Sequence, residues 1–184
     1  MIEPRKAIEE MEPYSPPLES RRGLLRLDFN ENTVGCSPKV LEAINNIKEE
    51  EIAAYPEYRK FKAKLANSIK VEPKKLMIAN ATDEAIAVIM QAYIEKGDEI
   101  ILPIPTFAMF KFYAQLAEAK IKEILYTTNL TFPTKKVLTA INKKTKLVIL
   151  CNPNNPTGTL IDKKDIIKII EKLGETPVIE GFEE

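Results

Sequence analysis

The sequence contains no histidine and no tryptophan, and its only two cysteines, Cys36 and Cys151, lie far apart. Without histidine the chain cannot form a Ser–His or Cys–His nucleophile pair or a histidine-based metal site. Two cysteines are too few for a secreted disulfide scaffold, so we expect two free thiols in a reducing compartment. No apolar run is long enough to span a bilayer, and the charged N-terminus lacks a hydrophobic signal region. A soluble, cytoplasmic protein is therefore expected.

The chain also lacks an excess of charge of either sign. Its 184 residues include 27 Lys and Arg and 27 Asp and Glu, which gives a formal net charge of zero. This balance offers no electrostatic argument for binding to nucleic acid or to an anionic membrane. A hydrophobic content of 45% is ordinary for a globular protein, and a chain of this length can bury a core without disulfides.

The first third of the sequence has few periodic segments. Residues 1–25 are rich in proline and charge and predict an extended arm that packs against nothing. The apolar alternation of residues 24–32 predicts a short strand. Ser37 followed by Pro38 has the residue types of a helix N-cap and first turn, and a second helix is expected over residues 58–69.

From residue 76 onward, segments typical of strands alternate with segments typical of helices. Such alternation predicts βαβ units in a three-layer α/β/α fold with a mainly parallel sheet. No helix is expected after the last strand, whereas a parallel sheet is normally covered by helices on both faces. The alternating segments therefore indicate either an incomplete domain or a small complete domain whose final strand is the edge of the sheet. Strands are expected at 76–78, 99–103, 120–126, 146–150 and 177–180, and helices at 82–93, 106–117, 137–141 and 162–173.

The strongest motif is Asn-Pro-Asn-Asn-Pro-Thr-Gly at residues 152–158, directly after the apolar strand 146–150. Its two Asn-Pro steps favour an extended, turning backbone. The motif places amide side chains at the carboxyl edge of a parallel sheet, where α/β proteins bind ligands. An asparagine there can donate to a phenolate oxygen. The plain alternative is a tight turn before the helix that starts near Asp162.

This motif resembles the signature loop of the fold-type I, class I/II aminotransferases. Other motifs resemble the histidinol-phosphate aminotransferases, in that family's order and spacing from about Tyr14 to the end of the chain: LDFNEN with Gly35, Ser37 and Pro38, then Tyr55-Pro56, Asp83-Glu84 and Pro105-Thr106-Phe107. The resemblance implies part of the large domain of a pyridoxal 5'-phosphate (PLP) enzyme. That enzyme would be a homodimer and would exchange an amino group between L-glutamate/2-oxoglutarate and a phosphorylated amino substrate. It also implies an arm with a first strand at 1–35, a helical small-domain segment at 36–70 and an incomplete PLP-binding domain at 71–184.

The resemblance also implies roles for residues near the cofactor. Asn155 matches the asparagine that binds the 3-hydroxyl oxygen of PLP, and Phe107 matches the aromatic residue that stacks on its ring. The alternative for Phe107 is a core aromatic. Ala81, Thr82 and Asp83 match the helix start that binds the cofactor phosphate, although Thr82 or Asp83 would also cap a helix without any ligand. The family has glycines near this turn, whereas alanine disfavours positive φ.

Four further residues are matched to more distant parts of the site. Tyr55 matches a tyrosine that reaches the cofactor phosphate of the opposite subunit, its alternative being a half-buried tyrosine beside a turn. Tyr14, Asn30 and Asn32 match residues that approach the substrate, and each is otherwise a solvated polar residue in a turn.

Three groups required for transamination lie, in the family, in or after the next strand: the Schiff-base lysine, the aspartate on the pyridine nitrogen and the arginine on the substrate carboxylate. No lysine here matches the first, and only a gapless match places Glu180 at the aspartate. We therefore expect a truncated chain that does not transaminate alone and has no catalytic residue of its own. The alternatives are a threonine-phosphate decarboxylase-like PLP enzyme and a non-catalytic dimerisation or binding module. The absence of a G-x-G-x-x-G motif after any predicted strand argues against a dinucleotide-binding domain.

Overall fold

A computed structural model describes residues 2–13, 15, 19, 21 and 23–174, and the backbone of 178–181. Contacts divide the chain into two compact units: unit 1 comprises Met1–Glu12 with Ala79–Glu184, and unit 2 comprises Pro13–Ile78. These units do not coincide with the predicted segments 1–35, 36–70 and 71–184, whose assignment to parts of a larger enzyme stays a prediction. Among the described residues, no helix is both long and apolar enough to cross a membrane.

Unit 1 is built on a parallel sheet. Its strands are β1 (Glu99–Ile104), β2 (Lys120–Leu125), β3 (Thr145–Cys151) and β4 (Val178–Gly181), arranged in the order β2-β1-β3-β4. Central β3 is buried along nearly its whole length, as expected for a parallel strand covered on both faces.

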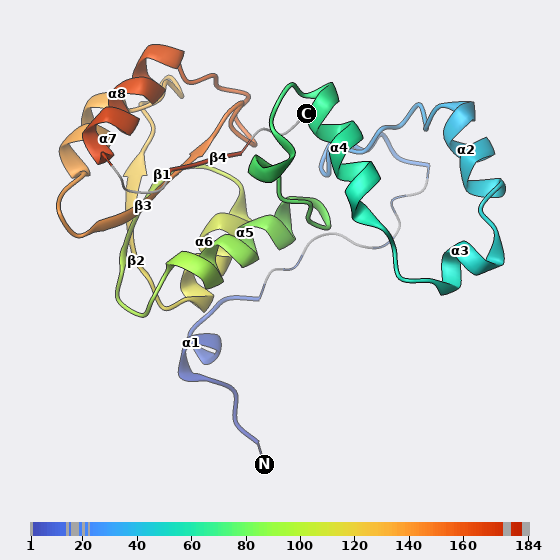
Figure 1. The fold of residues 1–184 in the computed structure, drawn as a ribbon. Helices are drawn as coiled ribbons and strands as arrows, with labels where there is room; N and C mark the ends of the chain where they lie inside the picture. Colours follow the sequence, from blue (N-terminus) through green and yellow to red (C-terminus); the bar gives the residue numbers. More distant parts are fainter. Residues whose placement is uncertain are drawn as a thin grey trace. The chain divides into compact units, whose positions relative to one another are not determined.

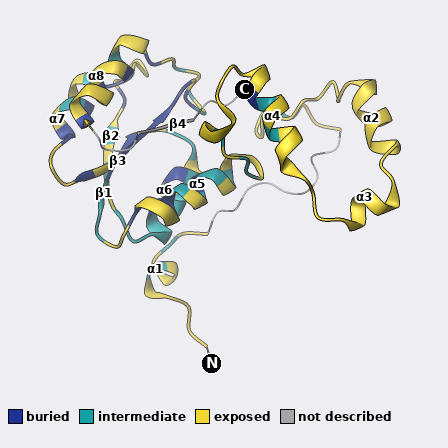
Figure 2. Ribbon diagram, viewed as in Figure 1, coloured by how far each residue is buried: buried dark blue, intermediate teal, exposed yellow. Residues whose placement is uncertain are grey.

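Four helices cover the two faces of this sheet (Figure 1). Helices α5 (Ala81–Tyr93) and α6 (Ala108–Leu116) pack on the face formed by Ile100, Leu102, Leu147, Ile149 and Cys151. Helices α7 (Thr134–Ala140) and α8 (Lys163–Leu173) pack on the opposite face, formed by Ile101, Val148 and Leu150. The alternation of side chains along each strand thus fills two separate cores. This arrangement confirms the predicted three-layer α/β/α fold, and Figure 2 shows the burial concentrated in its sheet.

The helix limits within unit 1 follow from local sequence. Helix α8 begins after Asp162, whose side chain accepts a hydrogen bond from the backbone N–H of Lys164 at 2.9 Å. It ends at Gly174, which has φ +65°. An N-cap carboxylate and a C-terminal glycine at positive φ are the residue types that satisfy unpaired helix ends. The helices and strands expected from residue 99 onward agree with those observed to within three residues.

The first residues of the chain depart from the prediction of an unpacked arm. Residues Lys6–Glu9 form a short helix, α1, that contacts α6. The Arg5 guanidinium, at the start of this turn, donates to the carbonyl oxygen of Leu116 at 2.8 Å. The prediction is therefore wrong for this stretch, because a long side chain beside the prolines and charges provides a specific anchor.

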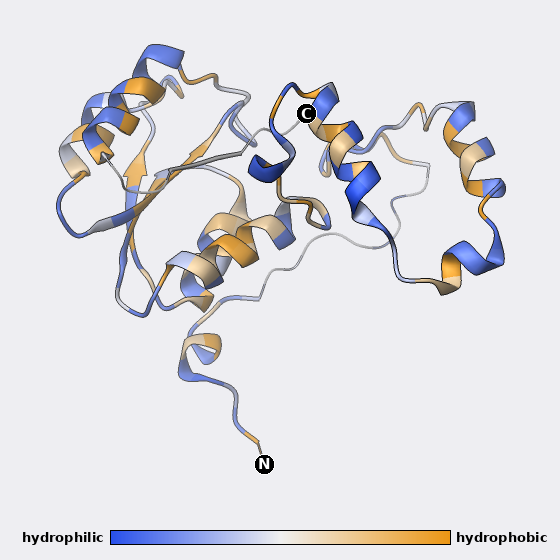
Figure 3. Ribbon diagram, in the orientation of Figure 1, coloured by the Kyte–Doolittle hydropathy of each residue, from blue (hydrophilic) through white to orange (hydrophobic). Residues whose placement is uncertain are grey.

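Unit 2 consists of α2 (Pro38–Asn45), α3 (Glu49–Ala53), α4 (Tyr58–Ser68) and the 3₁₀ turn η1 (Pro73–Lys75). Ser37 caps α2 as predicted, with its hydroxyl oxygen 3.4 Å from the N–H of Lys39. Among the described residues of this unit only Ala66 is fully buried. Figure 3 shows hydrophobic positions along the ribbon of α2. Val40, Leu41 and Ile44 of this helix are about half exposed, and so is Ile47 just after it.

Two expected strands are absent among the described residues. Residues 76–78 are irregular, and residues 24–32 form bends and irregular backbone. A strand needs a neighbouring strand to complete its backbone hydrogen bonds, and neither segment has one. The second segment is instead held by Arg21, whose guanidinium contacts Asp28 at 2.6 Å and Glu31 at 3.1 Å and lies over the ring of Phe29.

Candidate active site

The order of the strands creates a crevice at the carboxyl edge of the sheet. From β1 the chain passes through α6 on one face to β2, whereas from β3 it passes through α8 on the other face toward β4. Neighbouring parallel strands whose connections leave in opposite directions form a topological switch point, the usual ligand site of open α/β sheets. Residues 105–107 follow β1 and residues 152–158 follow β3, so they flank this point.

The loop at residues 152–158 is closed by its own hydrogen bonds. The Oδ1 atom of Asn152 accepts from the N–H of Ile161 at 2.9 Å. The Nδ2 group of Asn154 donates to the Pro105 carbonyl at 2.9 Å and to the Thr157 hydroxyl at 2.8 Å. Both asparagines are almost fully buried. Two of the three asparagines of the motif therefore maintain the loop itself.

Asn155 differs from its two neighbours. It is half-buried, and its backbone N–H lies 3.5 Å from the Cys151 sulfur, which fixes the main chain at this position. Its side-chain amide has no hydrogen-bond partner among the residues that the structure describes. Asn155 is thus the asparagine of the motif whose amide is available to a ligand.

Phe107 is the N-cap residue of α6 and is half-buried. Its ring meets that of Phe110 edge to face, with centroids 5.8 Å apart and planes at 89°. It also packs at the border of the core that α5 and α6 form with the sheet. The ring therefore has a fixed orientation without being enclosed, and its stacking role stays a prediction.

The start of α5 lies at the same edge of the sheet. A short connection joins α5 to β1, and the two pack together, so the helix runs opposite to the strand and begins at its carboxyl end. Ala81 has φ +64° despite its Cβ, and the side chain of N-cap Asn80 makes no capping hydrogen bond. The carboxylate of Glu84 instead accepts from the N–H of Asn80.

Capping by Thr82 or Asp83 was the ligand-free alternative for this turn, and it is wrong. Both residues lie inside the helix, because α5 already begins at Ala81. Ala81 and Thr82 are exposed and Asp83 is half-buried. The first turn therefore keeps N–H groups that no Asn80 cap satisfies, as at anion-binding helix starts.

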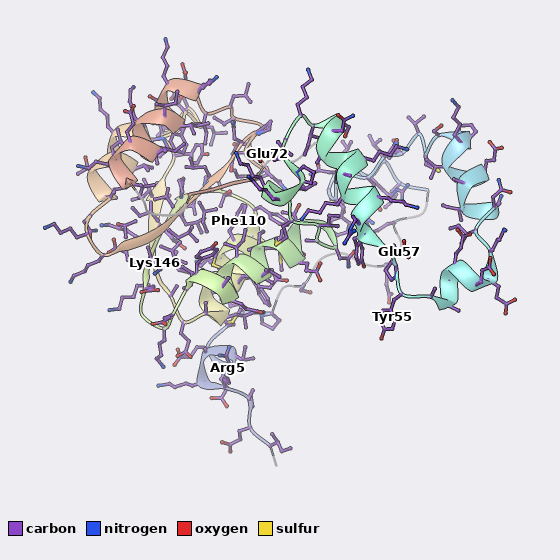
Figure 4. The ribbon with its side chains drawn as sticks, in the orientation of Figure 1. Arg5, Tyr55, Glu57, Glu72, Phe110 and Lys146 are labelled. Carbon is purple, nitrogen blue, oxygen red and sulfur yellow. The ribbon has the colours of Figure 1, made fainter. Side chains whose placement is uncertain are left out.

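The predicted residues of unit 2 are all exposed where described. Tyr55 is 99% exposed and projects from the chain between α3 and α4, so it is not the half-buried tyrosine of the plain alternative (Figure 4). Asn30 has φ +52°. Asn32 closes its own turn, since Oδ1 accepts from the N–H of Val34 at 3.1 Å and Nδ2 donates to the Gly35 carbonyl at 2.8 Å. Tyr14 lies outside the described residues.

Similarity to known proteins identifies the family of the chain. The profile of the family "Aminotransferase class I and II" matches residues 22–179. The chain belongs to this family. It is 38% identical over 151 residues to a histidinol-phosphate aminotransferase of Caldanaerobacter subterraneus subsp. tengcongensis, covering 80% of this chain and 43% of that protein. It is 35% identical over 185 residues to histidinol-phosphate aminotransferase 2 of Carboxydothermus hydrogenoformans, covering 95% and 51%.

A solved structure agrees in fold. The histidinol-phosphate aminotransferase of Sinorhizobium meliloti, in complex with pyridoxal-5'-phosphate, superposes with a TM-score of 0.82 at 20% sequence identity, covering 98% of this chain and 50% of that one. The chain thus spans about half the length of the class I and II aminotransferases that it matches.

Two features of this aminotransferase chain were not expected from its sequence. Asn154 links the two loops of the crevice, a role that the spacing of the motif does not indicate. Tyr126, directly after β2, is 7% exposed. Burial raises the pKa of its phenol to about 12, with a smaller contribution from nearby Cys151. The available signal was the alternation at the end of β2, where Tyr126 stands two residues after Ile124 and so faces the same core.

Glu180 lies in β4, where its backbone pairs with that of Leu150, one residue before the end of β3. This register puts Glu180 near the carboxyl edge of the sheet, beside the loop at 152–158. Its side chain lies outside the described part of the structure. The match of Glu180 to the family's aspartate stays a prediction.

Proposed function

We propose that the chain is the cofactor-binding part of a histidinol-phosphate aminotransferase. The whole protein would be a cytoplasmic homodimer that exchanges an amino group between L-glutamate/2-oxoglutarate and a phosphorylated amino substrate. The family and the names of the relatives support this activity. The observation that carries it is the available side-chain amide of Asn155 at the switch point, at the same edge of the sheet as Phe107 and the start of α5.

The donor set of unit 1 fits pyridoxal 5'-phosphate. Bound in such a site, this cofactor supplies an aldehyde and an electron-withdrawing ring that accepts negative charge from the amino-bearing carbon. Asn155 would donate through Nδ2 to the phenolic oxygen, which favours the deprotonated form of that oxygen. Phe107 would cover one face of the ring and exclude water from it.

The phosphate would bind at the start of α5. The N–H groups of Ala81, Thr82 and Asp83 and the positive end of the helix dipole favour an anion there. The carboxylates of Asp83 and Glu84 oppose a phosphate, and the hydrogen bond of Glu84 to the Asn80 N–H holds one of these charges in place. A requirement for several N–H donors follows from this repulsion.

The residues of unit 2 are assigned by the family resemblance alone. The exposed Tyr55 would reach the cofactor phosphate that a second copy of the chain binds. Tyr14 and Asn30 would approach the substrate. Because both ends of the Asn32 amide are engaged within residues 32–35, Asn32 would act by shaping this turn.

The proposal is tested by titrating the chain with pyridoxal 5'-phosphate and following the absorbance of the cofactor. Asn155→Ala removes a hydrogen bond to a charged oxygen, so we expect Kd to rise about tenfold or more. Asn67→Ala makes the same change on an exposed face of α4 and should leave Kd unaltered. A wild-type chain that fails to bind millimolar cofactor, or an Asn155→Ala variant that binds as tightly as wild type, would refute the assignment.

The reaction itself is tested on the whole protein. With L-glutamate as amino donor we expect 2-oxoglutarate to form, dependent on an imidazole-type phosphate acceptor. Release of carbon dioxide from threonine phosphate, without amino exchange, would instead identify the decarboxylase.

A further inference from the structure

The side chain of Asn154 spans the crevice between β1 and β3. Its Nδ2 group donates across the switch point to the carbonyl oxygen of Pro105 at 2.9 Å, and within its own loop to the Thr157 hydroxyl at 2.8 Å. Pro105 stands two residues before Phe107, and Asn154 stands one residue before Asn155. A single amide group therefore joins the backbone that carries the ring to the backbone that carries the available amide.

The same amide begins a longer chain of hydrogen bonds. The Thr157 hydroxyl donates to the Thr159 hydroxyl at 2.9 Å, and the Thr159 hydroxyl donates to the Leu130 carbonyl at 2.8 Å. Leu130 lies in the connection between β2 and α7. All donors point in one direction, an arrangement in which each bond polarises and strengthens the next. The loops after β1, β2 and β3 are thus tied at one edge of the sheet.

The orientation of the Asn154 amide is fixed by its partners. A carbonyl oxygen can only accept, so Nδ2 must face Pro105 and Oδ1 must face away. Oδ1 is buried without a hydrogen-bond partner among the residues that the structure describes, and Asn154 is only 2% exposed. An unsatisfied buried acceptor costs stability. Its presence indicates that the two protons on one neutral nitrogen are what this position requires, and neither serine nor threonine can supply them.

We infer that Asn154 is a positioning residue, which holds Phe107 and Asn155 at a fixed separation across the switch point. The consequence for the cofactor rests on the proposed function, whereas the link between the loops does not. The effect should therefore be visible in the free chain, before any cofactor is added.

The decisive variant is Asn154→Asp, which keeps the shape of the side chain but replaces the donating nitrogen by an acceptor opposite the Pro105 carbonyl. Thr157→Val removes the next hydroxyl of the chain at nearly constant volume, and Thr157→Ser retains it. Leu173→Ala is the matched control, because it removes core packing at the end of α8 remote from the crevice.

Two measurements are made on each variant. The first records backbone amide chemical shifts of Phe107 and Asn155 by NMR in the free chain. The second is the titration with pyridoxal 5'-phosphate. We expect Asn154→Asp and Thr157→Val to move both resonances more than Leu173→Ala does. We also expect Asn154→Asp to raise Kd about tenfold, Thr157→Val to raise it severalfold and Thr157→Ser to have a smaller effect than valine.

The inference is overturned if Asn154→Asp is folded and the resonances of Phe107 and Asn155 move no more than in Leu173→Ala. If the aspartate variant does not fold, the comparison of Thr157→Val with Thr157→Ser decides instead, and equal shifts in the two overturn it. A wild-type chain that does not bind the cofactor contradicts the proposed function. The chemical shifts in the free chain test the link between the loops independently of that result.

Discussion

Replacing Ala81 by glycine is expected to stabilise unit 1. Ala81 adopts φ +64° at the first position of α5. The left-handed conformation costs a residue with a Cβ about 1–2 kcal/mol. Glycine avoids this cost but loses about 0.5–1 kcal/mol through its greater freedom in the unfolded chain. The difference predicts a net gain of about 0.5–1 kcal/mol.

This gain is measured as the free energy of unfolding in urea, or as a rise in Tm of about 2–3 °C. The control is Ala85→Gly in the same helix, where φ is not positive and glycine should destabilise by about 1 kcal/mol. Opposite signs in the two variants support the strained start of α5. If Ala81→Gly is destabilising to the same extent as Ala85→Gly, Ala81 has ordinary helical geometry in solution and the reasoning fails.

Three further changes test other parts of unit 1. The raised pKa of Tyr126, about 12 against about 10 in the unfolded chain, means that stability is complete below pH 10 and is lost as the pH rises toward 12. The free energy of unfolding of Tyr126→Phe should therefore fall about 2 kcal/mol less than that of wild type between pH 9 and pH 12, and equal losses would contradict burial as the cause. Asp162→Ala should lower the free energy of unfolding by about 1 kcal/mol and Asp162→Asn by much less, because both aspartate and asparagine accept from the Lys164 N–H; equal effects would exclude the cap. Ile149→Ala, at a position 1% exposed, should cost about 3 kcal/mol in urea unfolding, and a loss below 1 kcal/mol would contradict its place in the core.

The parallel sheet was predictable because its strands carry a signal that does not depend on context. The run Leu147–Val148–Ile149–Leu150 is apolar at every position, which is typical of a strand covered on both faces. The helix from Asp162 was equally readable, since an N-cap carboxylate, an apolar stripe and a terminal glycine all agree.

The strands expected at 24–32 and 76–78 failed for the opposite reason. A short apolar alternation becomes a strand only beside a partner, and a single sequence does not show whether that partner exists. Arg21 illustrates the competing solution, because one guanidinium gathers Asp28, Glu31 and the Phe29 ring and holds the segment as a loop. Contacts of this kind depend on side-chain directions that hydrophobic periodicity does not encode.

The sequence predicted which segments form the candidate site, but not which side chains maintain the loop and which are available to a ligand. The motif at 152–158 predicted the crevice, and the family resemblance singled out Asn155 but gave no role to Asn152 or Asn154. The hydrogen bonds supply those roles, because both side chains maintain the loop. The left-handed Ala81 was likewise unpredictable, since alanine is a poor residue for that conformation.

The anchoring of Arg5 to the Leu116 carbonyl has a consequence for biosynthesis. The two residues are separated by 111 positions, and the whole of unit 2 is translated between them. At a translation rate of about 5–20 residues per second, the N-terminal turn waits roughly 6–20 s for α6 to emerge from the ribosome. During that interval the segment has no docking site on unit 1, so the first residues to be made are among the later ones to reach their native place.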